Sequence, residues 1–218
     1  MDATYKDFIK TGEIIYTGRV DSLKSFSGKN RIKLTWLLVS DPKITKNVVY
    51  WNNKADSLVL NVIKTANTDT ITTIIDSLAE MTYTFQVYTY DNFGHSSVKA
   101  EVIGTAYGDL FANTIYNRPL NTAIYNTTTK NLAITWYGVS PQAVILEMSY
   151  TDNAGVTKTV TELPVLDINY LNRPKAFAPI SNLPNFKKGT SFQYRTGYKP
   201  SPLSIDTFYS SWTSLLVP

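Results

Sequence analysis

The stretch TYTFQVYTYDNFGHSS, residues 82–97, decides the fold class of this chain. Apolar and polar side chains alternate along its first half, and a period of two is typical of a β-strand with one face in a core. The alternation predicts an inward set of Tyr83, Phe85, Val87 and Thr89 and an outward set of Thr84, Gln86, Tyr88 and Tyr90. Asp91 to Gly94 then forms a turn, because glycine accepts a positive φ. We interpret the stretch as one strand of an antiparallel sandwich.

Similar strand patterns recur along the chain, separated by turn residues roughly every 8–12 positions, as in all-β sandwiches. They are RIKLTW (31–36), VVYWNN (48–53), SLVLNV (57–62), TITTIID (70–76), LAITWYG (132–138), VILEMSY (144–150), VTKTVTE (156–162) and GTSFQYRTGY (189–198). The numbers of Trp36 and Trp136, in similar strands, differ by 100, and a repeat of this length indicates duplicated domains. We therefore predict an all-β chain with a short N-terminal leader (1–15), a first sandwich (16–107) and a second, divergent sandwich (108–218).

The motif Ile32-x-Leu34-x-Trp36, the later Leu78, Tyr83-x-Phe85-x-Val87 and the turn Tyr90-Asp91-x-x-Gly94 resemble a fibronectin type III domain, an immunoglobulin-like β-sandwich. The resemblance implies that Trp36 and Tyr83 pack across the two sheets, with Leu78 on the corner before the tyrosine. In the second half Trp136 matches, but Phe192 stands where the tyrosine is expected. A hydroxyl bond to the backbone, worth about 1 kcal/mol, would be lost with it. The predicted structural core is Trp36, Leu78, Tyr83, Phe85, Trp136 and Phe192.

A narrower resemblance covers most of the chain. YKDFIKTGEIIYTGRVDSL, RIKLTWLL, VVYWNNKADSL, YTFQVYTYDNFGHSS and YGDLFANTIYNRPL resemble uncharacterised tandem-sandwich surface lipoproteins of Bacteroidetes. This resemblance implies a cell-envelope location beside glycan-uptake proteins, with membrane attachment only through an upstream lipid anchor. The start MDATYKDFIK is not a signal peptide, so we expect that an export segment and a lipid-bearing cysteine have been removed from this sequence.

Composition argues against several classes of function. The chain has 218 residues and no cysteine, which excludes disulfides, thiolate zinc sites and cysteine nucleophiles. His95 is the only histidine and lies in a predicted turn, so neither a metal site nor a serine triad is expected. The basic residues are scattered at a net charge of +4, which predicts no nucleic-acid partner. No cofactor is expected.

We accordingly predict that the chain is not an enzyme. Paired carboxylates remain the catalytic alternative, because glycoside hydrolysis needs two of them close together. The pairs to consider are Asp91 with Asp109 and Asp152 with Glu162, although their surroundings are typical of turns and solvated strands.

Aromatic residues are the stronger functional signal, with 15 tyrosines and four tryptophans. Outward-facing Tyr88 and Tyr90, with either Tyr50 or Trp51 from a neighbouring strand, would form a patch on which sugar rings stack. Gln86, Asn52 and Asn53 would bind the sugar hydroxyls. Parity does not decide between Tyr50 and Trp51. The alternative is that the patch is covered by the partner domain or by the leader, through Phe8, Ile9, Ile14 and Ile15.

The segment YGDLFANTIYNRPL that joins the halves contains Leu110, Phe111 and Ile115, and is too apolar for a free tether. We expect it to fix the angle between the sandwiches or, alternatively, to line a groove. The tripeptide Asn-Arg-Pro occurs at 117–119 and 172–174, where Arg118 and Arg173 are candidates to pair with carboxylates. The leading functional hypothesis is a non-catalytic envelope module that binds glycan or positions another envelope protein. The alternative is a structural spacer or adhesion domain that presents another domain.

Overall fold

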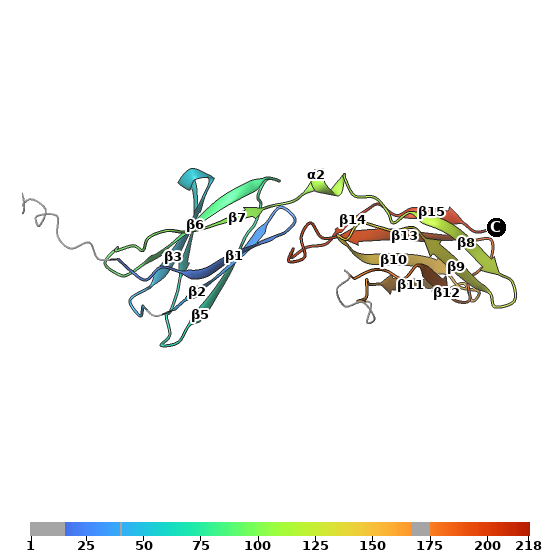
Figure 1. Cartoon of the computed structure of the whole chain (residues 1–218), viewed down its shortest axis with the longest axis horizontal. Helices are drawn as coiled ribbons and strands as arrows, with labels where there is room; N and C mark the ends of the chain where they lie inside the picture. The colour runs from blue at the N-terminus through green and yellow to red at the C-terminus, as the bar shows by residue number, and fades with distance from the viewer. Residues whose placement is uncertain (1–15, 40, 167–174) are drawn as a thin grey trace, which may run out of the picture. The chain divides into compact units, whose positions relative to one another are not determined.

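The computed structural model describes residues 16–39, 41–166 and 175–218, and Figure 1 shows that they consist mainly of β-strands. The chain divides into two compact units between Ala106 and Tyr107, one residue from the predicted boundary. Each unit is a β-sandwich, so the prediction of an all-β chain with two tandem sandwiches is confirmed. The leader and the second Asn-Arg-Pro lie outside the described residues. No helix in the described ranges is long and apolar enough to cross a membrane.

The first sandwich consists of a three-stranded sheet, in the order β1-β2-β5, and a four-stranded sheet, in the order β4-β3-β6-β7. Every strand pair is antiparallel. The strands are β1 (Asp21–Ser27), β2 (Ile32–Leu38), β3 (Lys46–Trp51), β4 (Asp56–Asn61), β5 (Asp69–Ile75), β6 (Thr82–Tyr90) and β7 (Ala100–Thr105), and the short turn η1 (Asn52–Lys54) joins β3 to β4.

The core of the first sandwich follows the alternation seen in the sequence. Strand β6 buries Tyr83, Phe85, Val87 and Thr89 and leaves the residues between them more exposed. On the facing sheet Trp36 of β2 is only 1% exposed. Leu78 is buried just before β6, and the hydroxyl of Tyr83 donates a hydrogen bond to the carbonyl of Ala79 at 3.1 Å. This bond ties the start of β6 to the turn that precedes it.

The second sandwich has the same arrangement. One sheet has the order β12-β9-β8, and the other has the order β11-β10-β13-β14, with β15 also paired to β13. The elements are α2 (Asp109–Ala112), β8 (Leu120–Asn126), β9 (Asn131–Trp136), β10 (Ala143–Thr151), β11 (Thr157–Glu162), β12 (Ile180–Leu183), β13 (Ser191–Tyr198), β14 (Phe208–Tyr209) and β15 (Thr213–Leu216). In Figure 1 strands β10 and β13 run side by side along this unit.

Phe192 and Trp136 are both buried in the core of the second sandwich. The bond that Phe192 cannot make is replaced from another strand, because the hydroxyl of Tyr150 on β10 donates to the carbonyl of Pro184 at 2.9 Å. Pro184 lies in the connection between β12 and β13, which corresponds to the corner held by Tyr83 in the first sandwich. The prediction that the second sandwich lacks a corner bond is therefore wrong. The bond is present, but Tyr150 makes it instead of a tyrosine at position 192.

The apolar joining segment belongs to the second unit. The ring of Phe111 packs edge-on against Tyr107 and Phe208, with centroid distances of 5.2 and 5.0 Å. Leu110 is 71% exposed. Ile115 lines two open cavities of this unit, which have volumes of ≈ 350 and ≈ 440 Å³. The aromatic contacts therefore account for Phe111 of this segment.

Arg118 of the first Asn-Arg-Pro is 4% exposed. Its guanidinium donates to the carbonyls of Tyr137 and Ala178, both at 3.0 Å. Burial lowers the pKa of Arg118, and the nearby Glu162 partly opposes this shift. Within the described part of the chain, Arg118 therefore binds backbone carbonyls rather than forming the carboxylate pair that we expected.

Candidate functional site

The register of the first sandwich decides which aromatic residues share a surface. Tyr50 of β3 lies opposite Gln86 of β6, so both side chains are on the outer face of the sheet together with Tyr88 and Tyr90. Trp51 follows Tyr50 and points the other way, where it packs against the core 6.3 Å from the ring of Phe85. Tyr50 is therefore the residue that joins the outer tyrosines.

The three outer tyrosines are half-buried, so their rings do not form a flat, fully exposed surface. Tyr50 and Tyr88 meet edge to face, with centroids 5.8 Å apart. Burial, together with the hydrogen bond to Tyr50, raises the pKa of Tyr90 to about 12. Two lysines also cover these rings: Lys46 lies 5.2 Å from the centroid of Tyr90 and Lys54 lies 4.9 Å from that of Tyr88. The outer face thus offers ring edges and ammonium groups, not a wide stacking platform.

The loop between β3 and β4 has an unusual backbone. Asn52, Asn53 and Lys54 all have positive φ, at 49°, 53° and 68°. Asparagine tolerates this left-handed conformation, but for lysine it costs roughly 1–2 kcal/mol. Two contacts hold the loop: the Ala55 N–H donates to the carbonyl of Asn52 at 3.0 Å, and the Asn52 amide donates to the Asp56 carboxylate at 2.5 Å. The loop therefore folds back over the end of the sheet.

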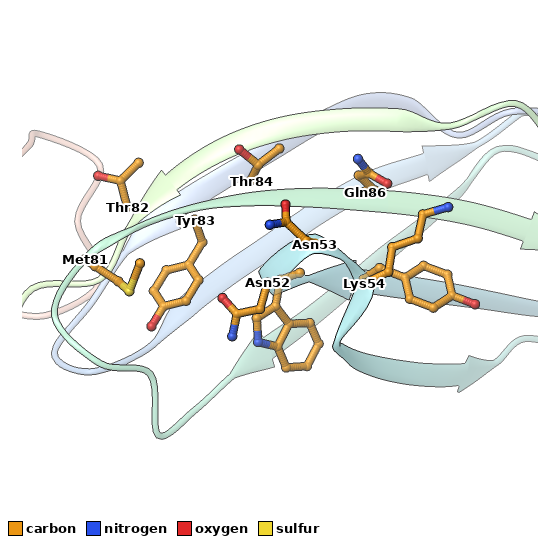
Figure 2. A pocket seen from close by; sticks show the side chains of 10 residues that line it. Asn52, Asn53, Lys54, Met81, Thr82, Tyr83, Thr84 and Gln86 are labelled. Atoms are coloured by element: carbon orange, nitrogen blue, oxygen red, sulfur yellow. The ribbon is translucent and has the colours of Figure 1, made fainter.

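A pocket of ≈ 330 Å³ lies beside this loop. It is lined by Tyr50, Trp51, Asn52, Asn53, Lys54, Met81, Thr82, Tyr83, Thr84 and Gln86. In Figure 2 the loop residues Asn52, Asn53 and Lys54 lie along one side of the pocket, and Thr82, Thr84 and Gln86 lie along the neighbouring strand. The volume is near the lower end of the range typical of small-ligand sites, about 300–1,000 Å³.

The pocket brings together only some of the residues that the sequence suggested. Tyr50, Trp51, Asn52 and Gln86 line it, whereas Tyr88 and Tyr90 do not and lie further along the outer face. The pocket is also lined by Lys54, Met81, Thr82 and Thr84, which were not among the predicted site residues. The outward parity of Thr82 and Thr84 was a usable signal, but nothing in the sequence indicated that Lys54 would fold back over the tyrosines.

The polar groups of the pocket are only partly used. Gln86 donates from its amide to Glu101 at 3.1 Å. Its carbonyl oxygen is buried without a hydrogen-bond partner among the described residues. Thr82 shares a hydrogen bond with Thr105 at 2.9 Å, and Thr84 is exposed. The pocket therefore offers neutral donors and acceptors beside the rings of Tyr50, Trp51 and Tyr83.

The candidate carboxylates of the catalytic alternative hold turns together. Asp91 is buried and accepts the backbone N–H groups of Phe93 and His95, both at 2.9 Å, and its other oxygen lies 2.7 Å from the His95 ring. Burial opposes ionisation of Asp91, but these hydrogen bonds prevail and lower its pKa. Asp109 belongs to the other unit.

Asp152 has the same role in the second sandwich, where it accepts from the N–H groups of Ala154 and Val156 at 3.0 and 2.9 Å. Glu162 accepts from the hydroxyl of Ser181 at 2.8 Å. Over the residues that the structure describes, no group of three or more His, Asp or Glu side chains is arranged to hold a metal ion. Three of the four candidate carboxylates, Asp91, Asp152 and Glu162, thus accept structural hydrogen bonds, and the fourth, Asp109, begins α2.

The second sandwich also carries a cation on aromatic rings, on the outer face of its larger sheet. The guanidinium of Arg195 lies 4.1 Å from the ring centroid of Tyr209 and 4.7 Å from that of Trp212. Glu147 accepts a hydrogen bond from Arg195 Nε at 2.6 Å. Here a carboxylate already neutralises the cation.

Strand pairing distinguishes between sandwich types. In immunoglobulin constant domains the fourth strand joins the sheet of the first, second and fifth strands. Here β4 pairs with β3, and β11 pairs with β10, so the fourth strand joins the other sheet in both units. Both sandwiches are therefore fibronectin type III-like.

Among solved structures, the chain matches tandem fibronectin type III domains. The FN1–FN3 domains of chicken CNTN1 match with a TM-score of 0.44 and 10% identity, over 93% of this chain and 68% of that chain. A two-domain fibronectin type III segment of chicken tenascin matches with a TM-score of 0.32 and 13% identity, over 91% of this chain and 98% of that chain. The search of curated proteins gave no match.

A family model described as a domain of unknown function, DUF4998, matches residues 1–208. The match covers both sandwiches nearly completely, up to the start of β14. The chain therefore belongs to the DUF4998 family.

Proposed function

We propose that this protein is a non-catalytic adhesion or scaffold module of the cell envelope that binds carbohydrate through the pocket of its first sandwich. The observation that carries the proposal is the composition of this pocket, which is lined by amide, hydroxyl and aromatic side chains. Carbohydrates present hydroxyl groups around apolar C–H faces, so they are bound by this combination of side chains.

The chemistry of the pocket matches a sugar ring more closely than an apolar ligand. The exposed side chains of Asn53 and Thr84 supply hydrogen-bond donors and acceptors, and the half-buried Gln86 also lines the pocket. The half-buried Tyr50, which lines the pocket, supplies apolar ring surface for the C–H groups. The envelope location is supported by the sequence resemblance alone and is part of the proposal.

A glycan array with the whole chain tests carbohydrate binding, and Asn53→Gly is the informative variant. Glycine keeps the positive φ of this position and removes only the amide, so the loop is not strained. We expect binding to fall about fivefold or more, as for the loss of one well-placed hydrogen bond.

The matched control is Asn185→Gly in the second sandwich, where the asparagine also has a positive φ, 54°. Its binding should equal that of the unmodified protein. An array with no signal for any glycan would contradict the proposal and favour the structural spacer.

A further inference from the structure

Resting on the proposed function, we infer that the sugar is anionic and that Lys54 binds its carboxylate or sulfate group. Lys54 is the single ionisable cation among the residues that line the pocket, and no aspartate or glutamate is among them. The nearest acidic group that contacts the loop, Asp56, accepts a hydrogen bond from Asn52 and does not line the pocket. A ligand in the pocket therefore meets one uncompensated positive charge.

Lys54 is exposed, and its side chain lies over two aromatic rings beside the pocket. Its ammonium lies 4.9 Å from the ring centroid of Tyr88 and 5.7 Å from that of Tyr50. Among the described residues, no carboxylate lies within ion-pairing distance of Lys54. The ring contacts therefore orient the ammonium without neutralising it, and an anionic ligand would provide the missing partner.

The backbone at Lys54 supports the same inference. Its φ of 68° is a conformation in which glycine or asparagine would be less strained. The cost of lysine at this position is explained if the ammonium contributes to binding, since strained residues occur preferentially at functional sites.

The surrounding face is also positive. The outer side of the larger sheet carries Lys46 and Lys99 in addition to Lys54, against one acidic residue, Glu101. Glu101 is already paired with Lys99 at 2.9 Å. A positive face attracts anionic saccharides and disfavours cationic ones.

The second sandwich provides an internal comparison. There Arg195 also lies on aromatic rings, but Glu147 forms an ion pair with it at 2.6 Å. Each of the two cations lies over two aromatic rings, but among the described residues only Arg195 is paired with a carboxylate. By this comparison, an anionic group of the ligand would pair with Lys54 as Glu147 pairs with Arg195.

The test is binding of the whole chain to a panel of acidic oligosaccharides, each paired with its neutralised form. Carboxyl reduction neutralises the uronic acids, and desulfation neutralises the sulfated sugars, so that each pair differs only in the anionic group. We expect the acidic member to bind about tenfold or more tightly, as for hydrogen bonds to a charged group. The difference should shrink as salt is raised, because the contact is exposed.

Three variants assign the effect to Lys54. Lys54→Asn removes the charge with a residue that accepts the same backbone conformation, and should lose the preference for the acidic member. Lys54→Arg keeps the charge and should retain the preference for the acidic member. Lys188→Asn removes an exposed lysine of the second sandwich and should leave binding unchanged.

The outcomes separate this inference from the proposed function. Equal binding of the acidic and neutralised members, or an unchanged preference in Lys54→Asn, would overturn the anionic assignment and leave carbohydrate binding intact. Absence of binding to every saccharide would overturn both.

Discussion

In the first sandwich the indole N–H of Trp36 is buried without a hydrogen-bond partner among the described residues. In the second sandwich the indole N–H of Trp136 donates to the hydroxyl of Ser181 at 2.8 Å, and this hydroxyl donates in turn to Glu162. The two tryptophans occupy corresponding strands, β2 and β9. The same ring therefore fills both cores, but only the second core satisfies its polar atom.

The corner before the sixth strand carries a hydrogen bond in both sandwiches, but a different tyrosine makes it. Tyr83 closes it from β6 itself, whereas in the second sandwich Tyr150 reaches it from the neighbouring strand β10. The comparison shows that the bond at the corner is retained while the residue that makes it changes. Both cores keep a tryptophan of the same shape and volume on corresponding strands. Among the described residues, in contrast, only Trp136 has a hydrogen-bond partner for its indole N–H, and the corner bond is made by different residues in the two sandwiches.

The largest expected effect tests whether the two cores are independent. Trp36→Ala should destabilise the first sandwich by about 3–5 kcal/mol, because a large cavity replaces a fully buried ring. Trp136→Ala should have a similar effect on the second sandwich. Hydrogen exchange measured by mass spectrometry, peptide by peptide, reports which unit opens. If either variant melted like the unmodified protein, the core assignment of that tryptophan would be incorrect.

A second substitution probes how tightly the larger sheets are packed. An added Cβ at Gly197 of β13 would overlap Ile145 Cγ2 and lie 2.8 Å from Thr207 Cγ2. Gly197→Ala should therefore cost about 1–3 kcal/mol, as overpacking does. At Gly104 of β7 the closest contact would be Ser25 Cβ at 3.0 Å, so Gly104→Ala should cost less. Urea unfolding of both variants measures the difference, and a greater loss for Gly104→Ala would contradict the packing described.

The corner bonds predict a smaller effect. Tyr83→Phe and Tyr150→Phe should each cost about 1 kcal/mol, since each leaves one backbone carbonyl without its hydroxyl donor. Phe192→Tyr should give no corresponding gain, because Tyr150 already binds the carbonyl of Pro184. Thermal unfolding followed by circular dichroism checks all three. Stabilisation by Phe192→Tyr would show that the corner of the second sandwich still lacks a bond.

The smallest expected effect is on the stability of the first sandwich at acidic pH. Hydrogen bonds from Lys64 and Thr65 lower the pKa of Asp69 from 3.8 to about 2. The unfolded chain thus takes up this proton at a higher pH than the folded chain, so the stabilisation is complete above pH 4 and is lost between about pH 4 and 2.

Asp69→Asn should remove this part of the pH dependence, measured as the melting temperature of the first sandwich against pH. The second sandwich of the same sample serves as the control. An unchanged acid profile in the variant would show that other carboxylates determine it.

Strand parity was the most informative feature of the sequence. The alternation in residues 82–90 correctly separated buried Tyr83 and Phe85 from the outer Gln86, because a period of two is imposed by the β backbone itself. The choice between Tyr50 and Trp51 required the pairing of β3 with β6, since parity within a strand does not say which face is buried.

The candidate site was only partly predictable. Gln86 and Asn52 were identified from residue type and parity, and both line the pocket. Lys54 was missed because its position depends on three consecutive left-handed residues, which no local propensity indicates for lysine. Tyr150 was missed as a corner residue because its bond to Pro184 joins residues that are far apart in the sequence.

The sequence by itself determined the all-β class and the two tandem sandwiches, because these depend on a local period and on a repeat. Only the tertiary structure decided that Tyr150 replaces the hydroxyl missing at Phe192 and that Lys54 lies over Tyr88 beside a polar pocket. Alternation is a property of neighbouring residues in one strand. A hydrogen bond or a pocket requires groups from different strands, and their distances exist only once the sheets have paired and packed.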